Sequence, residues 1–206
     1  MMSCKQDKGS SRVEALPYYN ETTFTPHWIK PGSSSLDTMH TIAAFELINQ
    51  DGEKLTNESF ENKIYIVDFF FTVCPGICPK LTSNMSLLQD EFLEDPDVLL
   101  LSHSVTPERD SVSVLKNYAE DKGIISGKWH LATGDREVIY NLGRYEYFIE
   151  ESLGLEKEAD EFLHTENFVL IDGNRHIRGI YNGLSKTSIN QLIADIYALK
   201  KEAYVK

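Results

Sequence analysis

The chain has 206 residues, 41% of them hydrophobic and 25% charged, a balance that suits one globular domain with extensions. The formal net charge of -12 would repel nucleic-acid phosphates, so the composition argues against a nucleic-acid partner. Three cysteines are too few for a disulfide framework. Two of them, Cys74 and Cys78, lie four positions apart and are therefore spaced as a redox pair or as two metal ligands.

The N-terminal region is expected to lie outside the main fold. Residues 1 to about 16 are polar without periodicity, which predicts a disordered tether, whereas residues 16–35 mix aromatic residues with Pro and Gly, which predicts an extended segment lying on the domain. We accordingly assign residues 1–30 to the tether and extended segment, and residues 31–206 to the domain. Cys4 with its polar flanks is similar to the start of a bacterial lipoprotein, whose cysteine carries a lipid. An incidental thiol on a disordered terminus is the alternative.

A run of apolar residues leads directly into the two cysteines. Residues 64–71 are apolar except for Asp68, which is the pattern of a strand buried on both faces of a sheet. Pro79 suits the first turn of a helix, because its missing N–H would be unpaired there, and apolar residues follow at helical spacing over 81–92. The cysteines are therefore predicted between a central strand and the next helix, at the edge where α/β sheets place their chemistry.

Hydrophobic periodicity and turn residues predict the remaining elements. The order is that of an α/β thioredoxin-like fold with an N-terminal extension and insertions, and we expect a mixed central sheet flanked by helices on both faces. The predicted elements are a strand at 39–47, a turn at 49–52, a strand at 98–105, a helix opened by 106–110 and ended near Gly123, a strand at 128–133, a helix carrying 138–142, an acidic surface segment at 150–161, a hairpin of strands 167–171 and 175–181, and a helix at 187–201.

The start of the predicted helix makes the two cysteines reactive. Unpaired N–H groups and the helix dipole stabilise a thiolate there, so we expect a lowered pKa for Cys78 and also for Cys74. Three residues separate the cysteines, which permits a disulfide and also leaves room for an ion between the sulfurs. Thiolates are soft ligands that suit Cu(I), and they accommodate Zn or Cu(II) when a nitrogen ligand is added.

Two of the six histidines are candidates for such a nitrogen ligand. His103 lies near the C-terminal end of a predicted parallel strand. His164 precedes a hairpin strand that is expected to run antiparallel to the first central strand, so it starts at the edge where that strand ends. We favour His164 over His103. The other histidines are assigned elsewhere: His27 and His40 before the sheet, His130 satisfied in the core, and His176 solvated beside Arg175 and Arg178.

The cysteine motif carries a resemblance to a known family. DFFFTVCPGICPKL, residues 68–81, resembles the signature of the SCO/SenC family of copper-binding thioredoxin-fold proteins. Later motifs fall in the same order, and the match spans roughly residues 68–183. These motifs are SVTPERD at 104–110, WHLATG at 129–134, and His164 ahead of FVLIDG at 168–173.

The chain departs from the family pattern after the second strand. The family usually has Asp-Pro-Glu-Arg-Asp with a Pro soon after, whereas Thr106 here replaces the Asp and Val112 the Pro. An acidic group near the metal is therefore missing, which puts any role assigned to it in doubt. Asp68 is kept, and a buried carboxylate needs a partner. We interpret Asp68 as structural, with tuning of the cysteines as the alternative.

The resemblance implies a function and a location. It implies that Cys74, Cys78 and His164 bind copper, as Cu(I) or Cu(II), and that the protein is a metallochaperone for the dinuclear copper centre of cytochrome c oxidase. The implied partner is the copper-receiving oxidase subunit, and another copper chaperone or a thiol reductant is a further candidate. The expected location is extracytoplasmic and periplasm-facing, anchored to the membrane, with lipid at Cys4 as one means of attachment.

A thiol–disulfide oxidoreductase is the alternative function. Under this hypothesis Cys74 and Cys78 are a catalytic redox pair that reduces the cysteines of the oxidase copper site. Cys74 is the expected nucleophile because it lies farther out on the loop. His164 would then be dispensable, although both activities can coexist because they use the same sulfurs.

Overall fold

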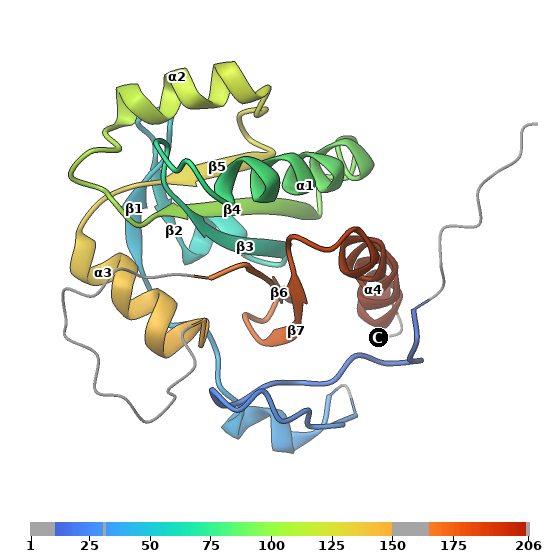
Figure 1. The fold of residues 1–206 in the computed structure, drawn as a ribbon. Helices are drawn as coiled ribbons and strands as arrows, with labels where there is room; N and C mark the ends of the chain where they lie inside the picture. Colours follow the sequence, from blue (N-terminus) through green and yellow to red (C-terminus); the bar gives the residue numbers. More distant parts are fainter. Residues whose placement is uncertain (1–10, 31, 150–164, 205–206) are drawn as a thin grey trace, which may run out of the picture.

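The computed structural model describes residues 11–30, 32–149 and 165–204. A five-stranded sheet in the order β5-β4-β3-β6-β7 forms its centre, and β1 and β2 form a separate hairpin (Figure 1). β3, β4 and β5 run parallel, whereas β6 is antiparallel to β3 and β7 is antiparallel to β6. The predicted mixed sheet is confirmed. The strands are β1 (Glu46–Ile48), β2 (Lys54–Thr56), β3 (Ile64–Phe70), β4 (Val98–Ser104), β5 (Trp129–Ala132), β6 (Asn167–Ile171) and β7 (Ile177–Asn182).

The central strand is β3, and its seven residues are all buried. Along its whole length it pairs with β4, from Ile64 opposite Val98 to Phe70 opposite Ser104. On its other side it pairs with β6, with Val67 opposite Val169. A strand in this position buries side chains on both faces of the sheet, which explains why its sequence is apolar without alternation.

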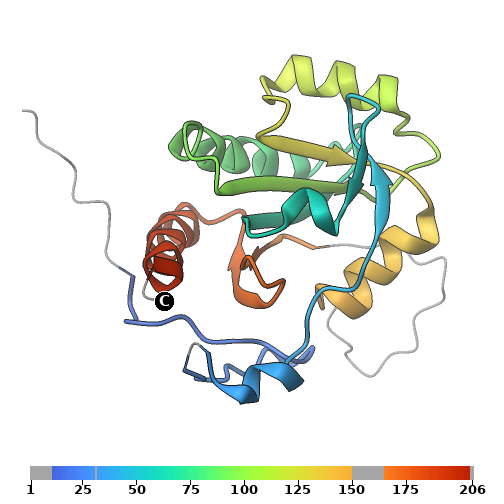
Figure 2. The same cartoon turned by 180° about the vertical axis from the view of Figure 1, so that it is seen from behind.

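Helices cover both faces of the sheet, as predicted. Buried residues of α1, α2 and α4 share one core with one face of the sheet, whereas α3 and the following turns pack with the β1–β2 hairpin on the other face (Figures 1 and 2). In the described part of the chain, no helix is long and apolar enough to span a bilayer. The helices are α1 (Cys78–Glu91), α2 (Val112–Lys122), α3 (Arg136–Asn141) and α4 (Lys186–Tyr204), with 3-10 turns η1 (Ser34–Thr38) and η2 (Asn57–Phe60) and a π-helical turn η3 (Leu142–Glu146).

Capping residues fix where two of these helices begin and end. The Ser111 hydroxyl accepts a hydrogen bond from a first-turn N–H of α2, and Gly123 ends that helix with a φ of 68°. The Asp135 carboxylate accepts two N–H groups at the start of α3. The predicted stop at Gly123 is therefore confirmed.

The segment before the sheet lies against the domain. Tyr18 pairs with His27, and Tyr19 pairs with Ile177 on β7, so the predicted extended segment is confirmed. Its path along the sheet edge is visible from both sides (Figures 1 and 2). Ser11 Oγ donates to the Asp195 carboxylate at 2.6 Å, which anchors the segment to α4. The prediction of a disordered tether reaching residue 16 is therefore wrong for residues 11–16.

The predicted strand at 39–47 is also wrong over most of its length. Strand pairing begins only at Glu46, and η1 precedes it. Side chains accept two of the backbone N–H groups between them. The N–H of Ala43 donates to the Glu146 carboxylate at 2.8 Å, and the N–H of Phe45 donates to the side-chain amide oxygen of Asn57 at 2.7 Å. These partners are distant in the sequence, so local β propensity does not decide this segment.

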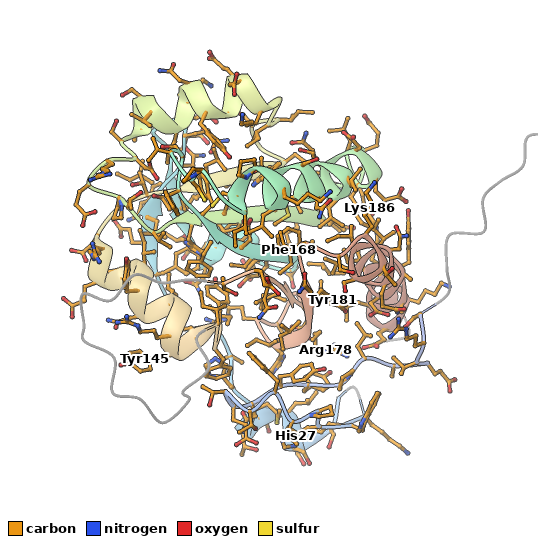
Figure 3. All side chains as sticks on the ribbon, in the orientation of Figure 1. His27, Tyr145, Phe168, Arg178, Tyr181 and Lys186 are labelled. Carbon is orange, nitrogen blue, oxygen red and sulfur yellow. The ribbon has the colours of Figure 1, made fainter. Side chains whose placement is uncertain are left out.

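Arg178 on β7 ties the N-terminal segment to the sheet and to α4 (Figure 3). It is buried, with 3% of its surface exposed, and it pairs with Asp172 at 3.1 Å and Glu202 at 2.7 Å. Its guanidinium also donates to two backbone carbonyls of the N-terminal segment and lies 3.9 Å from the centre of the Tyr18 ring. One cation thus pairs with two carboxylates and holds three elements together.

His176 belongs to the same buried group. It is 7% exposed, its Nδ1 lies 3.4 Å from the Asp172 carboxylate, and its ring meets Tyr18 edge-on. The expectation that His176 is solvated beside Arg175 and Arg178 is wrong. The N-terminal segment covers this side of β7. The residues around His176 in the sequence give no sign of this long-range contact.

Replacing Arg178 by Met should lower the free energy of unfolding by about 3 to 5 kcal/mol, because the buried carboxylate of Asp172 and the partly buried one of Glu202 lose their cation. Urea unfolding followed by circular dichroism measures this change. The matched control is Lys54→Met, which breaks the exposed Lys54–Glu46 pair and should change stability by less than about 1 kcal/mol. Equal effects of the two substitutions would contradict the role assigned to Arg178.

Candidate metal centre

The cysteine loop lies where β3 ends and α1 begins, as predicted (Figure 1). Cys78 is the first residue of α1, and Pro79 occupies the first turn. The N–H of Cys74 donates to the Phe71 carbonyl at 3.3 Å, which folds the loop back toward the end of the strand. The site therefore stands at the edge formed by the C-terminal ends of the parallel strands.

The two thiols differ in exposure and in acidity. Both are free, with Cys74 partly exposed and Cys78 buried. Burial opposes ionisation of Cys74, yet hydrogen bonds from the Cys78 thiol and from the N–H groups of Gly76, Ile77 and Cys78 hold its pKa below the usual value. Burial raises the pKa of Cys78 to about 12, assisted by its hydrogen bond to Cys74. The expected lowered pKa is therefore confirmed for Cys74 and wrong for Cys78.

The direction of the backbone explains this difference. The amides at the beginning of α1, including that of Cys78 itself, converge on the sulfur of Cys74. Cys78 instead packs in the hydrophobic core with neighbours such as Phe70 and Leu81. The helix start thus stabilises charge on the outer sulfur and leaves the inner one as a neutral thiol.

Asp68 has the partner that a buried carboxylate needs. It lies opposite Ser102 on β4 and accepts a hydrogen bond from that hydroxyl, which in turn accepts one from Trp129 Nε1 at 2.8 Å. Burial raises the pKa of Asp68 to about 7, although the hydrogen bond from Ser102 opposes this rise. A charge on Asp68 in turn raises the pKa of Cys78. The hydrogen bond from Ser102 supports a structural role for Asp68, and its effect on the pKa of Cys78 supports a role in tuning the cysteines.

His103 is not near the cysteines. It is fully buried and stacks on Phe69 at 5.0 Å, close to Phe45 and Tyr147. These residues form the core on the sheet face opposite the one that holds Cys78. The structure therefore removes His103 as a candidate ligand. His130 is buried with Asn49 3.4 Å from its Nδ1 atom, in keeping with its assignment to the core.

His164, the favoured third ligand, lies outside the described residues. Shortly after it, the Glu166 carbonyl accepts a hydrogen bond from the Gly183 N–H at 2.7 Å. A Cβ atom on Gly183 would lie 2.7 Å from Cδ2 of Leu81, so this part of the chain packs on the first turn of α1. Among residues 11–30, 32–149 and 165–204, no three His, Cys, Asp or Glu side chains gather as a metal site.

One buried residue beside the loop was not predicted from the sequence. Asp110, at the end of the TPERD turn, is fully buried, and its carboxylate accepts a hydrogen bond from the Thr72 hydroxyl at 2.6 Å. Thr72 is two positions before Cys74. The available signal was two hydroxyl residues, Ser104 and Thr106, shortly before the Asp110 carboxylate.

A mixed sheet with one free thiol at the start of α1 and a second in the loop before it defines a thioredoxin-like dithiol protein. A family model described as SCO1/SenC matches residues 33–201, so the chain belongs to the SCO1/SenC family. A curated relative is the SCO1 protein homolog of Bacillus subtilis, which is 30% identical over 162 residues, or 76% of this chain and 81% of that protein. The resemblance inferred from the cysteine motif is confirmed.

Solved structures show the same fold. A SCO1/SenC family lipoprotein from Bacillus anthracis str. Ames is 28% identical with a TM-score of 0.64, covering 78% of this chain and 95% of that one. BsSco, a member of the Sco family of cytochrome c oxidase assembly proteins in which a disulfide switch was identified, is 28% identical with a TM-score of 0.61, over 81% and 95%. Arabidopsis thaliana ScoI with copper bound is 25% identical with a TM-score of 0.58, over 80% and 98%.

Limiting iodoacetamide at pH 7 should alkylate Cys74 at least about tenfold faster than Cys78, because only Cys74 combines exposure with a lowered pKa. Fragment-ion mass spectrometry of a Cys4→Ser variant measures the two sites separately. The rate at Cys74 should rise with pH and reach half its maximum below the usual thiol pKa of 9.0. Preferential labelling of Cys78 would contradict this assignment.

Acid should destabilise the protein through His103. Burial lowers the pKa of His103 from 6.5 to about 3, and its ring nitrogens have no hydrogen-bond partner among the described residues. Since the unfolded chain takes up this proton first, the stability due to neutral His103 is complete above pH 6.5 and is lost as the pH falls toward 3. The loss should approach about 5 kcal/mol once the pH lies below both pKa values, because each unit of pKa difference corresponds to about 1.4 kcal/mol.

The test compares urea unfolding of wild type and His103→Phe between pH 7.5 and pH 4. The variant should lose less stability with acid than wild type does, whatever the difference between them at pH 7.5. Parallel pH dependences would show that His103 does not resist protonation in the folded state.

Proposed function

We propose that this protein is a copper metallochaperone that delivers copper to the dinuclear copper centre of cytochrome c oxidase. The observation that carries the proposal is a pair of free thiols in a chain of the SCO1/SenC family, a partly exposed one in the loop before α1 and a buried one at the start of that helix. Arabidopsis ScoI binds copper, and BsSco belongs to a family of cytochrome c oxidase assembly proteins. Copper is here the cargo, which the protein must both hold and release.

Cys74 and Cys78 supply two sulfur ligands in the proposed site. Thiolate ligands suit Cu(I), and adding an imidazole lets the same site accept Cu(II). The N–H groups directed at Cys74 already favour its thiolate, which lowers the cost of deprotonation when copper binds. Cys78 must lose its proton as copper arrives, so we expect copper binding to release protons and to strengthen as the pH rises.

His164 is the proposed third ligand. The path of the chain after it supports this choice, because Glu166 bonds to Gly183 and Gly183 contacts Leu81 in the first turn of α1. His103, the other candidate, faces the opposite core. A neutral imidazole completes the nitrogen and sulfur donor set that Cu(II) prefers.

Thiol–disulfide exchange is a second candidate function, favoured by the asymmetry of the two thiols. The Cys74 thiolate would attack a disulfide of the oxidase copper site, and the departing partner sulfur would leave as a thiol. Cys78 would then lose its proton and attack Cys74, which releases the second partner thiol and leaves a Cys74–Cys78 disulfide. Two electrons pass to the partner. The disulfide switch identified in BsSco is consistent with such a cycle.

The proposed location is extracytoplasmic, with the domain held at the membrane. A solved family member from Bacillus anthracis is a lipoprotein, which supports lipid attachment at Cys4. Cys4 lies outside the described residues. The proposed partners are the copper-receiving oxidase subunit and either another copper chaperone or a thiol reductant.

Copper titration of the reduced protein under anaerobic conditions tests the metal site. His164→Ala should weaken Cu(II) binding by at least about tenfold and abolish the sulfur-to-copper absorption band, because one of three ligands is lost. His103→Phe is the matched control and should bind Cu(II) as wild type does. Unchanged binding by His164→Ala would refute the ligand set.

The same variants separate the two functions. Exchange with oxidised dithiothreitol needs only the sulfurs, so His164→Ala should retain it while losing Cu(II) binding. Loss of copper binding with loss of the oxidase copper centre in cells supports delivery of copper. Normal oxidase assembly by the His164→Ala protein would instead favour the thiol reductase.

A further inference from the structure

Asp110 is the hub of a hydroxyl network beneath the cysteine loop. The side chain is fully buried at the end of the turn that follows β4. One carboxylate oxygen accepts from Ser104 Oγ at 2.6 Å and from Thr106 Oγ1 at 3.0 Å. The other accepts from Thr72 Oγ1 at 2.6 Å. Three hydroxyl donors thus stabilise the buried carboxylate.

One of these donors belongs to the cysteine loop. Thr72 lies between the end of β3 and Cys74, and its N–H also points at the Asp110 carboxylate, at 3.4 Å. Ser104 and Thr106 come from the end of β4 and its turn, whose backbone is closed by a hydrogen bond from the Asp110 N–H to the Thr106 carbonyl at 2.9 Å. Asp110 therefore joins the start of the cysteine loop to the end of strand β4.

We propose that Asp110 is a positioning residue of the dithiol. By holding Thr72 it fixes the start of the loop, and it thereby sets how closely Cys74 approaches Cys78, which is anchored by α1. The effective concentration of one sulfur at the other follows from this geometry. The inference rests on the dithiol as the working site of the proposed function, but not on the identity of the third copper ligand.

Thr106 fits this arrangement in place of the Asp that the family pattern has. Its hydroxyl donates to Asp110, which a carboxylate at the same position could not do unless protonated. Two carboxylates side by side would also repel each other. The threonine therefore adds a donor to the network that restrains Thr72.

The experiment measures the equilibrium between the dithiol and its disulfide in dithiothreitol redox buffers, in a Cys4→Ser background without copper. Thr72→Val removes the hydroxyl that links the loop to Asp110 and should shift the equilibrium constant at least about fivefold. Thr72→Ser keeps that hydroxyl and should remain within about twofold of wild type. Ser104→Ala is the matched control, because it removes another hydroxyl from Asp110 that is not part of the loop, and it should also remain within about twofold.

The pattern of results decides the proposal. The proposal is supported if Thr72→Val shifts the equilibrium constant while Thr72→Ser and Ser104→Ala both leave it close to the wild-type value. Equal shifts by Thr72→Val and Ser104→Ala, or no shift by either, would overturn it. Asp110→Asn is the second variant if Thr72→Val does not fold. It should shift the equilibrium constant between dithiol and disulfide by a similar factor, and an unchanged constant would refute the role. Because no copper is present, these outcomes are independent of the His164→Ala titration.

Discussion

Burial of β3 on both faces is the constraint on which the site depends. Every residue of the strand is buried, and its backbone is paired with β4 on one side and β6 on the other. A one-residue slip would move Asp68 from one core to the other and separate it from Ser102. The register is therefore fixed, and with it the point at which the chain leaves the sheet and turns toward Cys74.

The end of this strand and the start of α1 divide the two sulfurs between different environments. The loop presents Cys74 to solvent and to the converging N–H groups, while the helix carries Cys78 into the core. The outer sulfur is thus accessible to a metal ion or a partner disulfide and favoured as a thiolate, whereas the inner sulfur is a buried neutral thiol. Both proposed functions need this asymmetry, because each begins at the outer sulfur and ends at the inner one.

The sequence predicted the elements whose burial is uniform and local. β3 is a nearly continuous apolar run, β4 begins with one, and α1 begins beside a proline, so these three elements and the place of the dithiol were predicted with nearly correct limits. The errors concern contacts between distant segments. His176 is covered by the N-terminal segment, and the residues near Ala43 bond to side chains of later elements. Neither contact leaves a periodic pattern in the sequence.

The candidate site was predicted less completely than the fold, for a related reason. Residue type and spacing identified the cysteines, but the pKa of Cys78 depends on which way each sulfur points from the helix start. Whether His103 can be a ligand depends on which face of the sheet its side chain occupies. The sequence predicts that face only when the register of the neighbouring strands is known. The geometry of pairing, not composition, carries this information.

The departure at Thr106 and the burial of Asp110 are aspects of one arrangement. A carboxylate this deep in the protein must receive hydrogen bonds from its surroundings, and the hydroxyls that reach it come from both sides of the β3–β4 edge. Where the family pattern has an acid, the Thr106 hydroxyl adds a donor to Asp110. The threonine therefore strengthens the hydrogen-bonded support of the loop that carries Cys74.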